Sequence, residues 1–132
     1  MKWSEAYLIG CPTVDEQHKE LIEKVDELEQ RLENDEADDH SFTDALMFVV
    51  DYARDHFRDE ENLMFETGYP GFENHRMLHD RLVNHLANFL KDMQQGNGGT
   101  FSELVSYLHV WIDGHVLVED IKFGKFFRTA KK

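Results

Sequence analysis

The sequence has little cysteine, no long apolar run and little positive charge, and each shortage excludes a class of protein. Cys11 is the single cysteine in 132 residues, so no internal disulfide can form, which is typical of a reducing compartment. No apolar run approaches the roughly 20 residues that cross a bilayer. The first residues also lack the apolar core and cleavage site of a signal peptide. We therefore expect a cytoplasmic protein with no membrane-inserted segment.

The scarcity of positive charge restricts the partners. The chain has 14 Lys and Arg against 27 Asp and Glu, a net charge of −13. The phosphates of nucleic acids and of anionic membranes would repel such a surface, so we expect neither as a partner. Apolar residues still make up 41% of the chain, which is enough to build a core. The length is that of a single domain over residues 1–132.

Long alternation of apolar and polar residues is also absent, so no strand is predicted. Apolar residues instead recur every three or four positions, which is typical of helices. They predict an irregular N-terminal arm (1–12) and helices over about 13–34, 41–66, 70–94 and 100–122. We expect Thr13 and Ser41 to cap the first two helices, Gly68 to end the second, Pro70 to start the third and Gly124 to end or bend the fourth. The short loops between them predict an all-α, up-down-up-down antiparallel four-helix bundle.

Histidine, by contrast, is abundant, with eight residues. His56 and Glu60 lie four residues apart near the end of the second predicted helix. His75 and His79 lie four apart near the start of the third. Residues four apart share a helix face, so each pair can direct two metal-type ligands the same way.

The first and fourth helices each add one histidine at the same end of the predicted bundle. His18 lies about five residues into the first helix, and His115 lies within about two turns of the end of the fourth. A lone histidine on an apolar stripe is usually a core residue, but five on four converging helices predict a metal site. Five imidazoles with one or two carboxylates are too many for one ion and suit two ions bridged by carboxylate.

The fourth helix offers two adjacent candidates for its carboxylate ligand. Glu119 is four residues after His115 and shares its face on an ideal helix, whereas Asp120 lies about 140° away. A local π-turn would bring Asp120 round to the same face, and such turns are frequent at functional sites. Spacing alone favours Glu119. His40, His85 and His109 lack partners at ligand spacing, and we predict that none of them is a ligand.

Taken together, these motifs resemble the hemerythrin family, and within it the single-domain bacterial proteins. The resemblance is carried by DEQH at 15–18, HFRDE at 56–60, the YP turn, HRMLH at 75–79 and HVLVED at 115–120. It selects Asp120 over Glu119, and with it a local distortion of the fourth helix. The metal ligands that it implies are His18, His56, Glu60, His75, His79, His115 and Asp120.

The resemblance also implies a cofactor, namely two non-haem iron ions with an oxo or hydroxo bridge, joined by Glu60 and Asp120. One iron would take three histidines, His75, His79 and His115. The other would take only His18 and His56, which leaves an open position where the family binds dioxygen.

The implied function is reversible dioxygen binding for transport, storage or delivery, by a monomer that is not an enzyme. The residues are consistent with a carrier, because the ligands are mostly neutral imidazoles and the E-x-x-H motif of oxygen-activating bundles is absent. Apolar neighbours are expected around the open position, where they would exclude water and offer no general acid: Leu21, Phe57, Trp111, Ile112 and Val116. The alternatives are oxygen or redox sensing, oxidase or peroxidase activity, and iron storage or nitric oxide binding.

Overall fold

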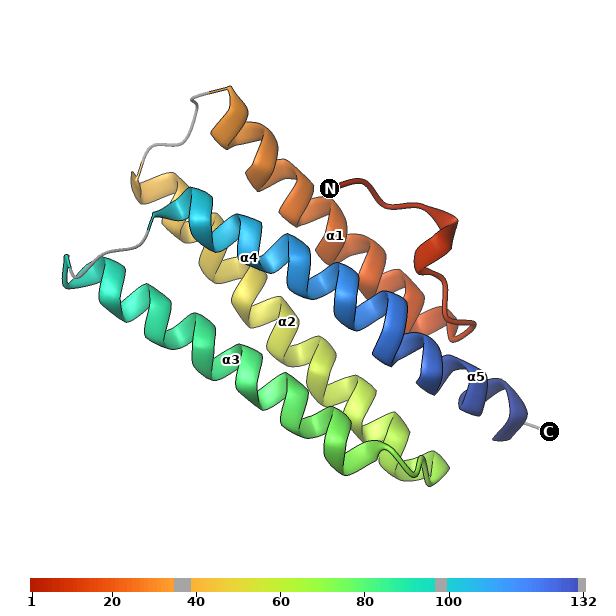
Figure 1. Ribbon diagram of the computed structural model, residues 1–132. Helices are drawn as coiled ribbons and strands as arrows, with labels where there is room; N and C mark the ends of the chain where they lie inside the picture. Colours follow the sequence, from red (N-terminus) through yellow and green to blue (C-terminus); the bar gives the residue numbers. More distant parts are fainter. Residues whose placement is uncertain (35–38, 97–99, 131–132) are drawn as a thin grey trace.

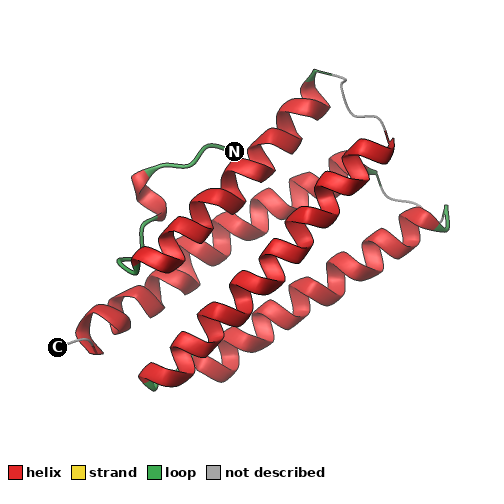
Figure 2. Ribbon diagram, turned by 180° about the vertical axis from the view of Figure 1, so that it is seen from behind, coloured by secondary structure: helices red, strands yellow, loops and turns green. Residues whose placement is uncertain are grey.

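The computed structural model describes residues 1–34, 39–96 and 100–130, and the side chains at 39–42, 45, 46 and 130 lie outside this description. Antiparallel helices form a four-helix bundle with up-down-up-down connections, which confirms the predicted fold (Figure 1). The described residues contain no strand (Figure 2). The elements in order are η1 (Glu5–Tyr7), α1 (Pro12–Glu33), α2 (Asp39–Thr67), α3 (Phe72–Gln94), α4 (Phe101–Gly114), η2 (His115–Asp120) and α5 (Ile121–Ala130).

The fourth helical segment combines three of these elements. Here η2 is a π-helix that joins α4 to α5, whereas η1 is a short 3-10 turn in the N-terminal arm. The start of α1, the α2–α3 turn and α5 all lie at one end of the bundle (Figure 1). None of the helices in the described part of the chain is long and apolar enough to cross a membrane.

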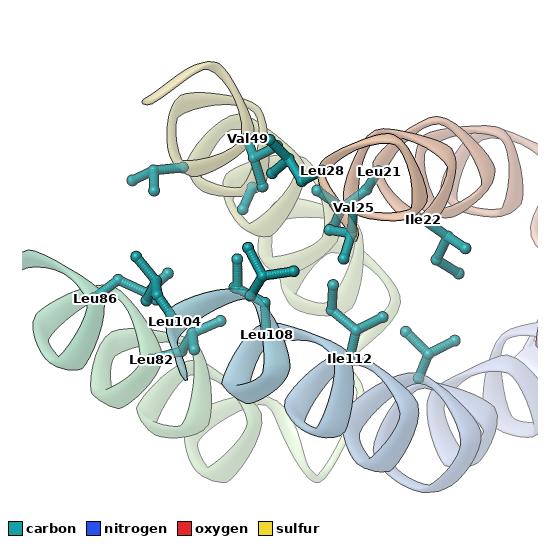
Figure 3. Packing of buried hydrophobic residues seen from close by; sticks show 14 of the residues in the cluster. Leu21, Ile22, Val25, Leu28, Val49, Leu82, Leu86, Leu104, Leu108 and Ile112 are labelled. Atoms are coloured by element: carbon teal, nitrogen blue, oxygen red, sulfur yellow. The ribbon is translucent and has the colours of Figure 1, made fainter. Parts of the chain in front are cut away.

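An apolar core fills the middle of the bundle and the half away from the α2–α3 turn (Figure 3). Burying one such side chain contributes about 1.5–3 kcal/mol, so this cluster fixes how far each helix is displaced along its neighbours. That displacement sets the depth of every residue nearer the other end. The labelled members of the cluster are Leu21, Ile22, Val25, Leu28, Val49, Leu82, Leu86, Leu104, Leu108 and Ile112.

A second, smaller apolar cluster closes the end beside the α2–α3 turn. Its members come from the arm, α1, α2 and α5: Ile9, Cys11, Val14, Met64, Phe123 and Phe127. Cys11 is only 3% exposed, so its thiol is a packing group. The space between the two clusters is therefore shielded from solvent on both sides.

The tight α2–α3 turn fixes the position of α3 along the axis of α2. Gly68 has φ +72°, the left-handed conformation predicted for the residue that ends a helix, and the amide of Tyr69 donates to the Met64 carbonyl at 2.9 Å. Pro70 does not start the third helix, which corrects the prediction. The amide of Phe72 donates to the Tyr69 carbonyl at 3.1 Å, so Pro70 occupies the second position of a β-turn, where its fixed φ is equally favourable.

The predicted N-caps are also corrected. Helix α1 begins at Pro12 with Cys11 as N-cap, because proline is favoured in the first position of a helix. Asp15, two residues after Thr13, links the arm to this helix: its carboxylate accepts from the amides of Ile9 (2.7 Å) and Gly10 (3.2 Å). Helix α2 begins at Asp39, before Ser41, whose side chain lies outside the described residues.

The fourth helical segment is longer than predicted. It continues through Gly124 to Ala130, beyond the predicted end at about residue 122. A Cβ atom at Gly124 would lie 2.1 Å from the Ile9 carbonyl oxygen. The glycine therefore allows the arm to approach the helix backbone rather than ending the helix.

Candidate metal centre

The seven residues predicted as metal ligands lie together between the two apolar clusters. They come from α1, α2, α3 and the π-helix η2, and none is more than 6% exposed: His18, His56, Glu60, His75, His79, His115 and Asp120. Buried polar side chains are normally paired by hydrogen bonds, so a group of seven in one place calls for a specific explanation.

The seven side chains form two groups that share both carboxylates. The three-histidine group consists of His75, His79 and His115 with Glu60 and Asp120. The two-histidine group consists of His18 and His56 with the same two carboxylates. Within each group, the atoms that could bind a metal all lie within 4.8 Å of one another.

Each carboxylate directs one oxygen toward each group. Glu60 Oε1 lies 2.7 Å from His75 Nε2, while its Oε2 lies 3.2 Å from His56 Nε2. Asp120 Oδ1 lies 3.1 Å from His115 Nε2, while its Oδ2 lies 3.0 Å from His18 Nε2. This division of oxygens is the arrangement of a carboxylate that bridges two ions.

The π-helix explains how Asp120 enters the site. The amide of Ile121 donates to the Val116 carbonyl five residues earlier, which widens this turn of the helix. His115 and Asp120, five apart, thereby share the inner face, and the predicted distortion is confirmed. Glu119 remains 28% exposed and lies 3.5 Å from Lys122 on the outside.

Oppositely charged neighbours control the protonation of the centre. Burial alone would lower the pKa of His18, but the Asp120 and Glu60 carboxylates raise it to about 10. The pKa of His75 rises to about 9 by the same balance. Burial would raise the pKa of both carboxylates, yet the surrounding histidines hold each below its ordinary value.

Two of the histidines have polar partners on their outer nitrogen. His56 Nδ1 lies 2.7 Å from the amide oxygen of Gln17, and His79 Nδ1 lies 2.9 Å from a carboxylate oxygen of Glu61. Sequence reasoning missed both partners, because each comes from a neighbouring helix at no fixed spacing. Their one signal is adjacency, since Gln17 precedes His18 and Glu61 follows Glu60.

A small apolar cavity adjoins the two-histidine group. It offers about 10 Å³ to the centre of a water-sized molecule, roughly the space of a single small molecule. Ile22 lines this cavity, and so do all five apolar residues predicted around the open position: Leu21, Phe57, Trp111, Ile112 and Val116. His18, His56, His115 and Asp120 form the polar part of its wall.

The other histidines that can be placed lie outside the centre. The His85 ring stacks on Tyr107 with centroids 4.4 Å apart. His109 lies between Glu29 (3.1 Å) and Asp113 (3.2 Å), and neither histidine belongs to a metal-type group. The side chain of His40 lies outside the described residues.

Similarity to known proteins agrees with this geometry. The family model described as Hemerythrin HHE cation binding domain matches residues 11–126. Bacteriohemerythrin of Stenotrophomonas maltophilia is 29% identical over 89% of this chain and 75% of its own length, and that of Methylococcus capsulatus is 28% identical over 94% of each. A crystal structure of wild-type hemerythrin superposes with a TM-score of 0.84 at 26% identity, covering 96% of this chain and 97% of that one. The chain therefore belongs to the hemerythrin family.

Proposed function

We propose that the centre holds two iron ions with an oxo or hydroxo bridge and that it binds dioxygen reversibly. The three-histidine group offers three nitrogens and two oxygens, and the two-histidine group offers two of each. With one shared bridge, the first ion would have six donors and the second five. In six-coordinate geometry the second ion would keep one open position.

The polar atoms of the centre fit this cofactor. His18 Nε2 and all four oxygens of Glu60 and Asp120 are buried without a hydrogen-bond partner, although each oxygen lies at ion-pair distance from a histidine nitrogen. His79 and His115 Nε2 lie 2.9 Å apart, and His115 and His75 Nε2 lie 3.0 Å apart. Donors at 90° around an ion, with bonds of about 2.1 Å, would be roughly 3.0 Å apart, whereas tetrahedral donors would be about 3.4 Å apart. These two separations are compatible with donors at 90° around one ion.

The cavity beside the two-histidine group carries the proposal of dioxygen as ligand. Its apolar wall, which includes Leu21, Phe57 and Ile112, would exclude water and admit a small apolar molecule. Two ferrous ions can supply the electrons that dioxygen takes up on binding. Apart from the proposed ligands His18, His56, His115 and Asp120, no described residue with an acidic or basic side chain lines the cavity, so the wall offers no free general acid to cleave the O–O bond.

The donor set favours a carrier over an enzyme. Five neutral imidazoles and two carboxylates give each ion little negative charge, and so little stabilisation of high oxidation states. We propose a cytoplasmic monomer that transports, stores or delivers dioxygen. Relatives include bacteriohemerythrins and the myohemerythrin of Sipunculus nudus, which is 23% identical.

Reversible oxygenation tests this function. The iron-loaded protein is reduced, exposed to air and then stripped of oxygen, while its visible absorption is followed. A carrier should show a band that appears with oxygen and disappears when oxygen is removed. One-way oxidation of the iron would contradict the proposal.

A variant that fills the cavity sharpens the test. Leu21→Phe adds bulk to the wall beside His18, so it should slow or weaken oxygenation while leaving the iron content unchanged. Leu117→Phe, on a residue 38% exposed, is the matched control and should behave like the wild type.

A further inference from the structure

We propose that Glu61 and Gln17 are positioning residues that make the two metal positions unequal. Glu61 places a negative charge behind His79 of the three-histidine group, whereas Gln17 places a neutral amide behind His56 of the two-histidine group. This inference rests on the proposed metal centre. We attribute to these two residues the stronger metal binding and the lower reduction potential of the three-histidine position relative to the two-histidine position.

The contacts form a repeated pattern across the helices. Gln17 adjoins the ligand His18 on α1 and supports His56 on α2. Glu61 adjoins the ligand Glu60 on α2 and supports His79 on α3. Helices α1 and α2 thus each contribute a ligand and, at the adjacent position, hold a ligand of the next helix in orientation.

The direction of both imidazoles is fixed by these contacts. His79 directs Nε2 into the centre, 2.9 Å from His115 Nε2, so its Nδ1 faces Glu61. His56 directs Nε2 toward Glu60 at 3.2 Å, so its Nδ1 faces Gln17. A neutral imidazole that binds metal through Nε2 carries its proton on Nδ1, and Glu61 and Gln17 are the acceptors of that proton's hydrogen bond.

The orientation of the Gln17 amide is itself determined by a neighbour. Its Nε2 donates to Asp59 Oδ2 at 3.0 Å, so its oxygen must face His56. The ring of His56 therefore meets a neutral acceptor. The other ligand of this group, His18, has a buried Nδ1 with no hydrogen-bond partner. Among the residues that the structure describes, no carboxylate therefore contacts the outer nitrogens of the two-histidine group.

The difference in charge has a chemical consequence. A carboxylate that accepts the Nδ1 proton makes an imidazole more basic and a stronger donor to metal, whereas an amide does so less. Its negative charge also stabilises the ferric over the ferrous ion. Because Glu61 is 19% exposed, water screens part of this effect but not all of it.

Stepwise metal binding tests the inference with Co²⁺ as the probe, because cobalt is redox-stable and coloured. Metal-free wild type should bind two ions in two steps, the tighter at the three-histidine group. Glu61→Gln keeps the shape and removes the charge, so it should weaken the tighter step about 10–100-fold and leave the weaker step within about threefold. Glu66→Gln, an exposed residue of the same helix, is the matched control and should change neither step.

A reciprocal variant moves charge to the other side. The double variant Gln17→Glu with Asp59→Asn shifts one negative charge from Asp59 to position 17 and restores a donor for the new carboxylate. It should raise the affinity of the weaker binding step and reduce the difference in affinity between the two steps. Asp59→Asn alone is its control.

Two further readouts separate positioning from a structural effect. In the cobalt-loaded protein, Glu61→Gln should shift one Nδ1-proton resonance, while Glu61→Asp, which keeps the charge, should restore most of the affinity. In the iron-loaded protein, Glu61→Gln should raise the reduction potential of one ion only.

An unchanged affinity of the tighter step, or equal losses of affinity in Glu61→Gln and Glu66→Gln, would overturn this inference alone. A wild type that binds fewer than two ions would overturn the proposed function and this inference with it.

Discussion

The two halves of the bundle bury opposite kinds of side chain. Away from the α2–α3 turn, helices meet through residues such as Leu28, Leu86 and Leu104. Between this core and the small apolar cluster that closes the end beside the turn, the same helices meet through five histidines and two carboxylates. The apolar half gains stability from burial itself. The polar half costs free energy unless a partner satisfies its atoms, so its stability should depend on metal.

Removal of a carboxylate that is proposed to bridge the two ions tests this difference between the two regions most strongly. Asp120→Ala should lower the affinity for both ions by more than about 100-fold, because Asp120 directs one oxygen to each group. Glu119→Ala is the matched control and should retain full iron, since its side chain is outside the centre. Iron per chain after competition with a chelator measures both. Similar losses in the two variants would refute the π-helix account.

The second prediction concerns pH in the metal-free protein. Proximity to carboxylates raises the pKa of folded His18 to about 10 and of His75 to about 9, above the ordinary 6.5 of the unfolded chain. The folded state then binds more protons between these values, so the stabilisation by these histidines is fully present below about pH 6.5 and falls as pH rises toward 9–10. The lowered pKa values of Glu60 and Asp120 set the acid limit, because their stabilisation is lost below the ordinary carboxylate pKa of about 4. The midpoint of thermal unfolding should drop by at least about 5 °C from pH 7 to pH 9.

The iron-loaded protein is the control for this pH dependence. Bound metal replaces these protons, so the loaded chain should show a much smaller change over the same range. Equal pH dependence with and without iron would contradict the assignment of the centre.

The apolar half should respond independently of metal. Leu104 is completely buried, so Leu104→Ala should cost about 2–5 kcal/mol of unfolding free energy. Iron content should remain that of the wild type, because the substitution leaves every ligand in place. Chemical denaturation with iron analysis measures both, and Leu117→Ala, on the surface, should change stability by less than about 1 kcal/mol. Loss of iron in Leu104→Ala would show that the two halves are coupled.

A smaller effect is expected where the arm crosses the fourth helical segment. Gly124→Ala would force its Cβ against the Ile9 carbonyl, so the arm must move at a cost of about 1–3 kcal/mol. In Gly114→Ala the new Cβ meets nothing within 4 Å, and the change should be neutral or stabilising by up to about 1 kcal/mol. Thermal unfolding compares the two, and an equal response would exclude close packing as the role of Gly124.

Periodicity in the sequence predicted the bundle and the inward direction of the histidines, because both follow from the 3.6-residue turn. It could not choose Asp120 over Glu119, since a π-helix breaks that period and only the family resemblance indicated it. The Thr13 cap failed because Pro12 already occupies the first position of the helix, which makes Cys11 the N-cap. Gln17 and Glu61 were missed because their partners lie on other helices.

The central claim is that one centre holds two ions through two shared carboxylates. The most direct test is anaerobic titration of the metal-free chain with Fe²⁺, with the iron retained per chain as the readout. The account predicts about two irons per chain in the wild type and the loss of both in Asp120→Ala. A stoichiometry of one or none in the wild type, or loss of only one ion in the variant, would contradict it.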